Sequence, residues 1–228
     1  MRYLGGKMRI GKQLADVIQA CEPRRYHEPF CGVFSVGKHI VADQRTAADI
    51  HPDLILLLNA LRDGWQPPTD ISREEYTRLR ESSPSALRGF TGFGCSFYGK
   101  FFQGYATDPR GYNFATTARK NLLKLAPMIQ GVEFKRQDYK EYDGKADVIY
   151  CDPPYAGTAD YRVGEFNPVE FWDWVRGRKE TVIVSEYEAP DDFETIWEQP
   201  TVVRIRDRET GKCGKSVERL FRRLFTRK

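Results

Sequence analysis

The sequence lacks the features that identify membrane, secreted and metal-binding proteins. No apolar run approaches the roughly 18 residues that a membrane-spanning helix needs, and the N-terminus has no apolar signal-peptide core. The five cysteines are an odd number without a C-x-x-C pair, and no histidine, cysteine and acid cluster has the spacing of metal ligands. We therefore expect a cytoplasmic protein with reduced thiols and no bound metal.

A strong net charge is also absent, so the overall balance indicates no particular partner. The formal charge is only +4. Its distribution is more informative, because residues 84–124 contain six Lys or Arg and one acid, and residues 202–228 contain ten Lys or Arg and three acids. Clustered positive charge of this kind suits a phosphate backbone, although a solvated basic face has the same composition.

Internal repeats and low-complexity tracts are missing too, and the chain instead alternates strands with helices. Its 228 residues, 40% of them apolar, suffice for one α/β domain with a small insertion. Apolar periodicity predicts a parallel sheet with flanking helices, followed by a basic antiparallel hairpin at the C-terminus. The predicted strands are 25–30, 46–50, 132–138, 148–151, 181–185, 201–207 and 217–225, and the predicted helices are 12–21, 52–61, 72–81, 116–129 and 166–176, with a further helix opening at 35–40.

Residues 148–155 read as a buried strand that ends in a stiff polar loop. Pro153 and Pro154 end the strand, because neither donates a backbone hydrogen bond and each fixes φ. The proline after Asp152 biases that residue to an extended conformation. The sequence therefore places an acid, a proline carbonyl and the ring of Tyr155 at a strand's carboxyl end, where open α/β sheets bind ligands.

An exocyclic amino group on a nucleobase fits this set of groups. Its lone pair is delocalised into the ring, and two acceptors that hold both its hydrogens would favour a pyramidal, nucleophilic nitrogen. Asp152 can supply one acceptor and the Pro153 carbonyl the other, while Tyr155 stacks on the base. The plainer interpretation is a strand followed by a Pro-Pro turn with a surface Asp.

Three further strand ends carry the residues of a nucleotide site. Gly32 follows the strand 25–30 and lets the backbone approach a ligand closely. Asp49, at the end of the next strand, stands where an acid takes ribose hydroxyls, and Asp138 ends the strand 132–138. Residues 6–12 match G-x-x-x-x-G-K, but a P-loop needs a preceding buried strand and a Ser or Thr after the lysine, and both are missing.

Residues 89–105 interleave glycine and aromatic residues without a helical or strand period. A flexible surface with rings and cations suits splayed nucleic acid, and a glycine-rich loop packed by its Phe side chains is the alternative. We expect DNA contacts in and around this segment. The expected DNA-binding residues are Arg88, Phe97, Tyr98, Lys100, Arg110 and Arg119.

Taken together, these motifs resemble the DNA adenine methylase family, which uses S-adenosylmethionine. Five segments carry the resemblance over nearly the whole chain and in the family's order. Residues 3–7 resemble its N-terminal cofactor motif, 28–32 its Phe-x-Gly loop, 48–50 its ribose-binding acid, 137–139 the segment at the cofactor's adenine ring, and 152–155 its catalytic tetrapeptide. The residues matched to the cofactor are Tyr3, Gly6, Lys7, Glu28, Pro29, Phe30, Gly32, Asp49, Ile50, Asp138, Tyr139 and Asp152, and those matched to catalysis are Asp152, Pro153, Pro154 and Tyr155.

The resemblance implies an α/β fold with a Rossmann-like methyltransferase sheet. Residues 1–61 and 121–228 would form the S-adenosylmethionine-binding catalytic domain, and residues 62–120 the inserted target-recognition segment. The implied activity is methylation of adenine N6 in double-stranded DNA, with the target base flipped out, by a monomer or weak dimer in the cytoplasm of a bacterial or phage-infected cell. Restriction-modification is the implied setting, and neither a metal nor a membrane is required.

Several alternatives stay open at this point. The family's glycine two residues past Gly32 is Phe34 here, so one alternative is a DNA-binding relative that has lost catalysis. The same tetrapeptide chemistry would also serve cytosine N4 or an RNA base. A protein amide would favour Asn at position 152, and an NTPase would need the missing P-loop features.

Overall fold

The molecule is built on one seven-stranded sheet with the order β3-β2-β1-β4-β5-β7-β6. The computed structural model describes residues 6–154, 166–206 and 213–224, with residues 201–206 and 213–216 described by their backbone alone. Strands β1 to β5 run parallel, and β7 pairs antiparallel with both β5 and β6. The strands are β1 (Arg25–Glu28), β2 (Gln44–Asp49), β3 (Val132–Arg136), β4 (Val148–Cys151), β5 (Thr181–Glu186), β6 (Phe193–Arg206) and β7 (Cys213–Arg223).

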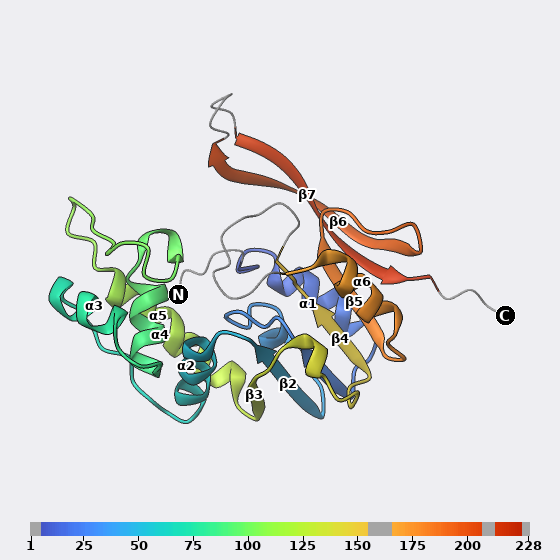
Figure 1. The fold of residues 1–228 in the computed structure, drawn as a ribbon, viewed down its shortest axis with the longest axis horizontal. Coiled ribbons are helices and arrows are strands. Elements are labelled where there is room, and N and C mark those ends of the chain that lie inside the picture. Colours follow the sequence, from blue (N-terminus) through green and yellow to red (C-terminus); the bar gives the residue numbers. More distant parts are fainter. Residues whose placement is uncertain (1–5, 155–165, 207–212, 225–228) are drawn as a thin grey trace.

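The chain reverses its direction of travel across the sheet between β1 and β4. After β1 it moves outward to β2 and β3, and then it returns to β4 on the other side of β1. In an open α/β sheet, the crevice at such a switch point, beyond the carboxyl ends of the strands, is where ligands bind. The candidate motifs at residues 28–32 and 152–154 follow β1 and β4, and so they meet at this edge (Figure 1).

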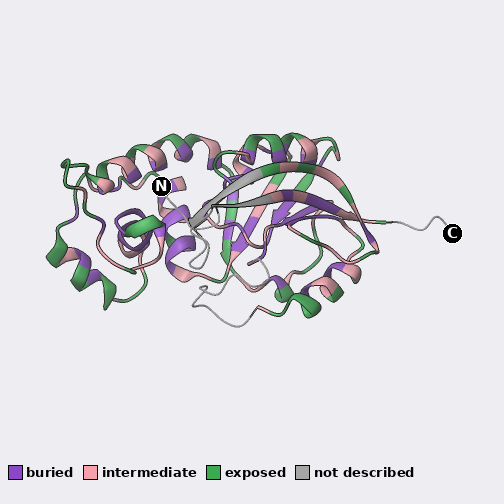
Figure 2. Ribbon diagram, turned by 90° about the horizontal axis from the view of Figure 1, so that it is seen from above, coloured by how far each residue is buried: buried purple, intermediate pink, exposed green. Residues whose placement is uncertain are grey.

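Helices lie on both faces of the sheet, whereas α3, α4 and α5 form a group with α2 at one side of it (Figure 1 and Figure 2). They are α1 (Gly11–Gln19), α2 (Pro52–Arg62), α3 (Arg73–Arg80), α4 (Ala86–Gly94), α5 (Phe114–Leu125) and α6 (Pro168–Arg176), with short 3-10 turns η1 (Gly37–His39), η2 (Phe97–Gly99), η3 (Ala126–Ile129) and η4 (Tyr139–Glu141). The predicted α/β class is therefore confirmed. Within the described ranges, no helix is long and apolar enough to cross a membrane.

Side chains on β4 alternate between the two layers of the core. Tyr150 packs with Leu14 of α1 in the larger apolar cluster, whereas Cys151 packs with Phe171 of α6 in the smaller one. This period of two follows from the pleat of a strand. Asp152 follows Cys151, so an extended backbone turns it back towards the α1 side.

The prediction that a helix begins at residues 35–40 is wrong. The chain forms only the three-residue turn η1 there, and the preceding Phe34 has a left-handed φ of 55°. A helix cannot pass through this backbone conformation. A separate turn precedes η1 at residues 31–34, where the Phe34 N–H donates a hydrogen bond to the Cys31 carbonyl over 2.7 Å.

The expectation of an aperiodic, flexible segment at residues 89–105 is also wrong for its first part. Residues 86–94 form α4, and Gly89 to Gly94 are all buried. A Cβ on Gly89 would lie 2.4 Å from the Asp53 carbonyl oxygen of α2, and a Cβ on Gly92 would lie 2.3 Å from the Phe101 ring. The glycines therefore permit close contact of α4 with α2 and with Phe101. Because α4 has no exposed face, its sequence has no amphipathic period that would predict a helix.

Arg88 of α4 is partly buried and its guanidinium is bound by groups of the protein itself, which does not match its predicted contact with DNA. Its Nη1 lies 2.5 Å from Oδ2 of the fully buried Asp53, and its other nitrogens donate to the carbonyls of Leu79 and Arg80. Removing one partner of such a buried pair typically costs about 3–5 kcal/mol. Arg88 thus holds α2, α3 and α4 together, and we remove it from the candidate DNA contacts.

We predict that Gly89→Ala lowers the free energy of unfolding by about 1–3 kcal/mol, because the added methyl group meets the α2 backbone. The matched control is Gly177→Ala, where the nearest atoms to a new Cβ lie at 3.4 Å. Urea unfolding of both variants measures the difference. Equal or greater stability of Gly89→Ala relative to the parent would contradict this packing account.

Candidate active site

The carboxyl ends of β1, β2, β4 and β5 bring together acids that are far apart in the sequence. Glu28 ends β1, Asp49 ends β2, Asp152 follows β4 and Glu186 ends β5. Glu28 and Glu186 are buried, whereas Asp49 and Asp152 are partly exposed. This edge therefore carries a group of carboxylates on a rigid frame, as the parallel register of the four strands requires.

The turn after β1 joins the end of β2 through the carboxylate of Asp49. The Gly32 N–H donates to Asp49 Oδ2 over 3.1 Å, and the His51 N–H donates to Oδ1 over 2.9 Å. Burial raises the pKa of Asp49, and these backbone hydrogen bonds oppose the rise. Gly32 and Asp49, which the sequence named separately as candidate cofactor residues, are therefore in direct contact, and Ile50 is exposed beside them.

Phe34 lies in the core and does not project from this turn into solvent. Its side chain is fully buried, and its ring lies edge-on to Phe134 at 5.3 Å between centroids. A Cβ on Gly37 would lie 2.3 Å from the same ring. The departure from the family's glycine therefore keeps the left-handed backbone that glycine favours, and the ring is accommodated on the inner side.

Glu28 occupies a buried polar position behind the turn. Its Oε2 accepts hydrogen bonds from the Tyr26 hydroxyl (3.0 Å) and the Gly37 N–H (3.1 Å). Burial raises the pKa of Glu28 well above its usual range, and the neighbouring Asp152 and Asp49 add to the rise. Glu28 therefore favours its neutral form. It stabilises residues 31–37, which follow β1, through its hydrogen bond from Gly37, and it lies next to the buried Pro29.

Asp138 and Tyr139 follow β3 and stabilise the short turn η4 that comes after it. Asp138 caps η4, where its Oδ1 accepts from the Lys140 N–H over 2.9 Å. The buried Tyr139 ring lies 5.1 Å from the Phe30 ring, and both contact Phe171 of α6. Burial raises the pKa of Tyr139 to about 12. An aromatic group therefore lines the edge near β1 and β3.

Asp152 and Lys7 form an ion pair in the middle of the edge. Lys7 Nζ lies 3.2 Å from Asp152 Oδ1 and 3.1 Å from Oε1 of Glu218 on β7. Burial lowers the pKa of Lys7, but the two carboxylates outweigh this effect, and the net shift is upward. The Lys7 ammonium is therefore retained at neutral pH between two carboxylates.

A cavity of about 300 Å³ opens beside Pro153, between the loops that follow β4 and β5. Its walls combine rings from α6 and the segment before it with acids from the end of β5. The lining residues are Pro153, Phe166, Pro168, Phe171, Trp172, Glu186, Tyr187 and Glu188. Burial raises the pKa of Glu186 to about 7. A volume of this size is typical of small-ligand sites.

Comparison with known proteins identifies the family of this chain. A family model described as "D12 class N6 adenine-specific DNA methyltransferase" matches residues 3–86 and 96–181. The chain belongs to this family.

The individual relatives of this D12-family chain share only a small part of its sequence. The DNA adenine methylases of two Vibrio cholerae serotype O1 strains are 27% identical over 183 residues, which cover 68% of this chain and 64% of theirs. The matched region therefore spans just under two thirds of those relatives. Among solved structures, Thermoplasma acidophilum 1320 is 13% identical with a TM-score of 0.43 (95% of this chain, 98% of that one), and TrmN from Thermus thermophilus is 12% identical with a TM-score of 0.39 (96% and 52%).

Two of the residues matched to the family motifs, Tyr3 and Tyr155, lie outside the described part of the chain. Gly6 is described and exposed, and Pro154 is partly exposed after Pro153. Across the described ranges, no three His, Cys, Asp or Glu side chains come close enough to hold a metal ion.

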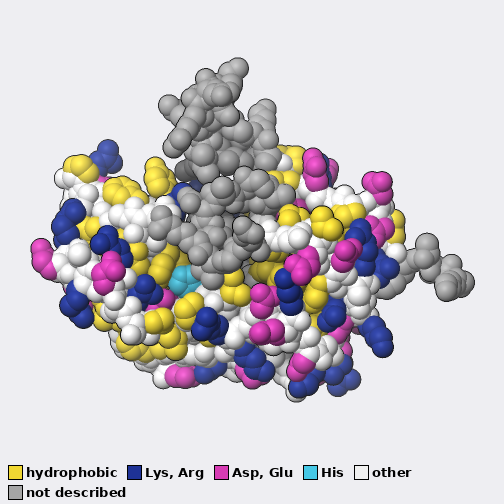
Figure 3. Space-filling model, viewed as in Figure 1, with side chains coloured by type: hydrophobic (Ala, Val, Ile, Leu, Met, Phe, Trp, Pro, Cys, Tyr) yellow, Lys and Arg dark blue, Asp and Glu magenta, His cyan; other side chains and the backbone are white. Residues whose placement is uncertain are grey.

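The residues proposed to contact DNA separate into two groups in this family member. Phe97 and Tyr98 are exposed, and Arg110 is exposed nearby, whereas Lys100 is half-buried. Arg119 is also half-buried, and its Nε donates to the Pro67 carbonyl over 2.8 Å. A cavity of about 340 Å³ lies beside the exposed rings, and cationic and apolar side chains are interspersed over this part of the surface (Figure 3). Its lining residues are Phe97, Tyr98, Thr107, Asp108, Tyr112 and Phe114.

Sequence reasoning missed Glu218, Ser185 and Glu186. Glu218 shares the inner face of β7 with Leu220, and its Oε1 accepts from the Ser185 hydroxyl over 2.8 Å. The available signal was an acid two positions from an apolar residue on the predicted strand, which places both side chains on the same face of the strand. The order β5-β7-β6, which brings β7 to the site, is not visible in local periodicity.

We predict that Phe34→Gly is more stable than Phe34→Ala by about 1 kcal/mol, because only glycine adopts φ near 55° without strain. Both variants should be less stable than the parent by about 3–5 kcal/mol, because both lose the buried ring. Urea unfolding at one pH measures all three proteins. The reverse order of the two variants would show that the left-handed turn is not retained.

Proposed function

We propose that this chain transfers a methyl group from S-adenosylmethionine to the exocyclic N6 amino group of adenine in DNA. The observation that carries the proposal is the position of Asp152 and Pro153 at the carboxyl end of β4, next to the strand that leads into the Gly32–Asp49 turn. Membership of the D12 family supports the choice of adenine N6.

The residues at β1, β2 and β3 suit the methyl donor. Asp49 would accept from the ribose hydroxyls, Asp138 would meet the adenine ring of the cofactor, and the Gly32 turn allows close approach of the backbone. The partly exposed Phe30 ring offers an apolar surface between them. When it is bound, the donor supplies an electrophilic sulfonium methyl group. The other proposed contacts with S-adenosylmethionine are Tyr3, Gly6, Lys7, Glu28, Pro29, Ile50 and Tyr139.

Asp152 and the Pro153 carbonyl would accept the two hydrogens of the target amine. This arrangement favours a pyramidal nitrogen with a localised lone pair, so the methyl group can transfer in line without a covalent enzyme intermediate. The contribution of the protein is then positioning and preorganised electrostatics. The product proton passes to solvent. Burial raises the pKa of Cys151 well above its usual range, which agrees with a packing role for this thiol.

The cavity beside Pro153 is the proposed site of the flipped-out adenine in double-stranded DNA. Pro154 and Tyr155 would complete its walls, with the Tyr155 ring stacked on the base. The proposed contacts with the surrounding DNA are Phe97, Tyr98, Lys100 and Arg110, in the segment between α2 and α5, and Arg119 of α5. The protein would act as a monomer or weak dimer.

We predict that Asp152→Ala lowers methyl transfer at least 10²-fold, while S-adenosylmethionine binding changes little, because the lost carboxylate acts on the amine. Transfer of tritium from labelled cofactor into DNA measures the rate, and calorimetry measures binding. The control is Asp143→Ala, which removes an exposed acid paired with Lys145.

Mass spectrometry of the methylated nucleoside identifies the target atom. N6-methyl-2′-deoxyadenosine is the expected product, and N4-methyl-2′-deoxycytidine or a methylated ribonucleoside would contradict the proposal. Wild-type transfer by Asp152→Ala would reject the role of the carboxylate. A parent protein that binds DNA but not S-adenosylmethionine would leave only the DNA-binding alternative.

A further inference from the structure

A chain of buried contacts runs from β5 through β7 and the N-terminal segment to Asp152. The Ser185 hydroxyl donates to Glu218 Oε1 over 2.8 Å, and the same oxygen lies 3.1 Å from Lys7 Nζ. Lys7 Nζ in turn lies 3.2 Å from Asp152 Oδ1. The exposed fraction of the side chain is 9% for Lys7, 6% for Glu218 and 18% for Asp152. The chain of contacts therefore becomes more exposed towards the candidate active site.

Such a buried ion-pair network contributes little net free energy to the stability of the fold. Each buried charge loses its hydration, and replacement of a buried ion pair by apolar groups of similar volume is often neutral or stabilising. Here one ammonium lies between two carboxylates that belong to strands on opposite sides of β5. A buried polar group that is fully hydrogen-bonded does, however, restrict geometry. Fixed orientation is thus the benefit that the contacts can provide.

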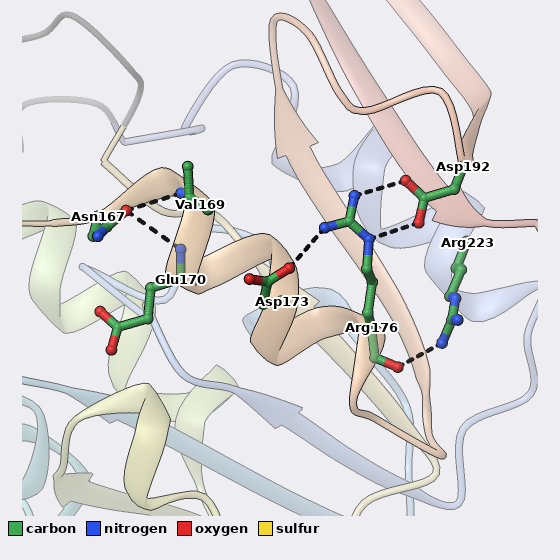
Figure 4. Close-up of polar contacts among 7 residues, drawn as sticks. All are labelled: Asn167, Val169, Glu170, Asp173, Arg176, Asp192 and Arg223. Atoms are coloured by element: carbon green, nitrogen blue, oxygen red, sulfur yellow. Dashed lines mark hydrogen bonds and ion pairs between the residues drawn. The ribbon is translucent and has the colours of Figure 1, made fainter.

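The frame that carries Glu218 is rigid along the described part of β7. In the register with β5, Ser185 faces Leu220 and Glu186 faces Arg219. Towards the C-terminus, Arg222 pairs with Glu194 of β6. Arg223 donates to the Arg176 carbonyl of α6, and the Arg176 guanidinium contacts Asp192 and Asp173 (Figure 4). Beyond Glu218, β7 is therefore fastened to both of its neighbours and to α6.

We propose that Glu218 is a positioning residue for methyl transfer. It holds the Lys7 ammonium, and Lys7 holds Oδ1 of Asp152, so that the plane of the Asp152 carboxylate is set before the target amine arrives. This role rests on the proposed function, because it concerns how Asp152 meets an amine. Glu218 itself touches no reacting atom, and Lys7 acts between the two carboxylates.

Glu218→Gln keeps the shape of the side chain and removes its charge. We expect the single-turnover rate of methyl transfer at saturating S-adenosylmethionine and DNA to fall roughly 10–100-fold, because a small misplacement of a reacting group has an effect of this size. The dissociation constants of S-adenosylmethionine and DNA should stay within about twofold. Glu218→Asp, which keeps the charge on a shorter stem, should give an intermediate rate.

The matched control is Glu198→Gln, which removes an exposed partner of Arg219 on the same hairpin without touching Lys7. Its rate should equal that of the parent, and thermal unfolding of every variant reports the stability of the fold. If Glu218→Gln does not fold, Glu218→Asp decides alone. A parent-like rate in the deciding variant, or a loss explained by weaker S-adenosylmethionine binding, overturns the positioning role.

Failure of this role is distinguishable from failure of the proposed function. If the parent protein methylates adenine in DNA and Glu218→Gln does so equally fast, the positioning role alone is wrong. If the parent transfers no methyl group to any DNA, the proposed function is wrong, and the role of Glu218 falls with it.

Discussion

The abrupt end of β4 determines where chemistry can take place in this molecule. β4 is buried between β1 and β5, and its four residues are completely enclosed. The two prolines that follow Asp152 cannot extend the hydrogen-bonded ladder, so the chain leaves the sheet at the switch point. Asp152 consequently has a buried strand on one side and two prolines with fixed φ on the other, and its carboxylate contacts the Lys7 ammonium.

Several carboxyl groups lie close together at the carboxyl ends of the parallel strands, and their mutual repulsion is reduced in two ways. Glu28 and Glu186 are buried with pKa values raised by burial, which favours their neutral forms. Asp152 and Glu218 instead share the Lys7 ammonium. The N-terminal segment and β7, nearly the two ends of the described chain, therefore both contribute to one site. The hairpin β6–β7, which pairs at the edge of the sheet, is therefore connected through Lys7 to a residue at the end of the central strand β4.

The sequence predicted the parallel strands and most helices because each has an apolar period or a clear cap. Ser72, for example, caps α3 as expected, and its hydroxyl accepts from the Glu75 N–H. Local patterns failed where tertiary contact decides the structure. The glycines of α4 signal flexibility in isolation but allow close packing against α2 in the fold. Arg88 has the composition of a DNA contact and the environment of a core ion pair. Glu218 reaches Lys7 only because β7 inserts beside β5, and that pairing leaves no local signal.

The central claim is that an amine hydrogen-bonds to both the Asp152 carboxylate and the Pro153 carbonyl at the end of β4. A crystal structure of the protein with adenine-containing duplex DNA and an unreactive analogue of S-adenosylmethionine tests it most directly. The account predicts a flipped adenine in the cavity beside Pro153, with N6 about 3 Å from an Asp152 oxygen and about 3 Å from the Pro153 oxygen. An adenine that stays in the duplex, or an N6 atom that contacts neither oxygen, would contradict the account.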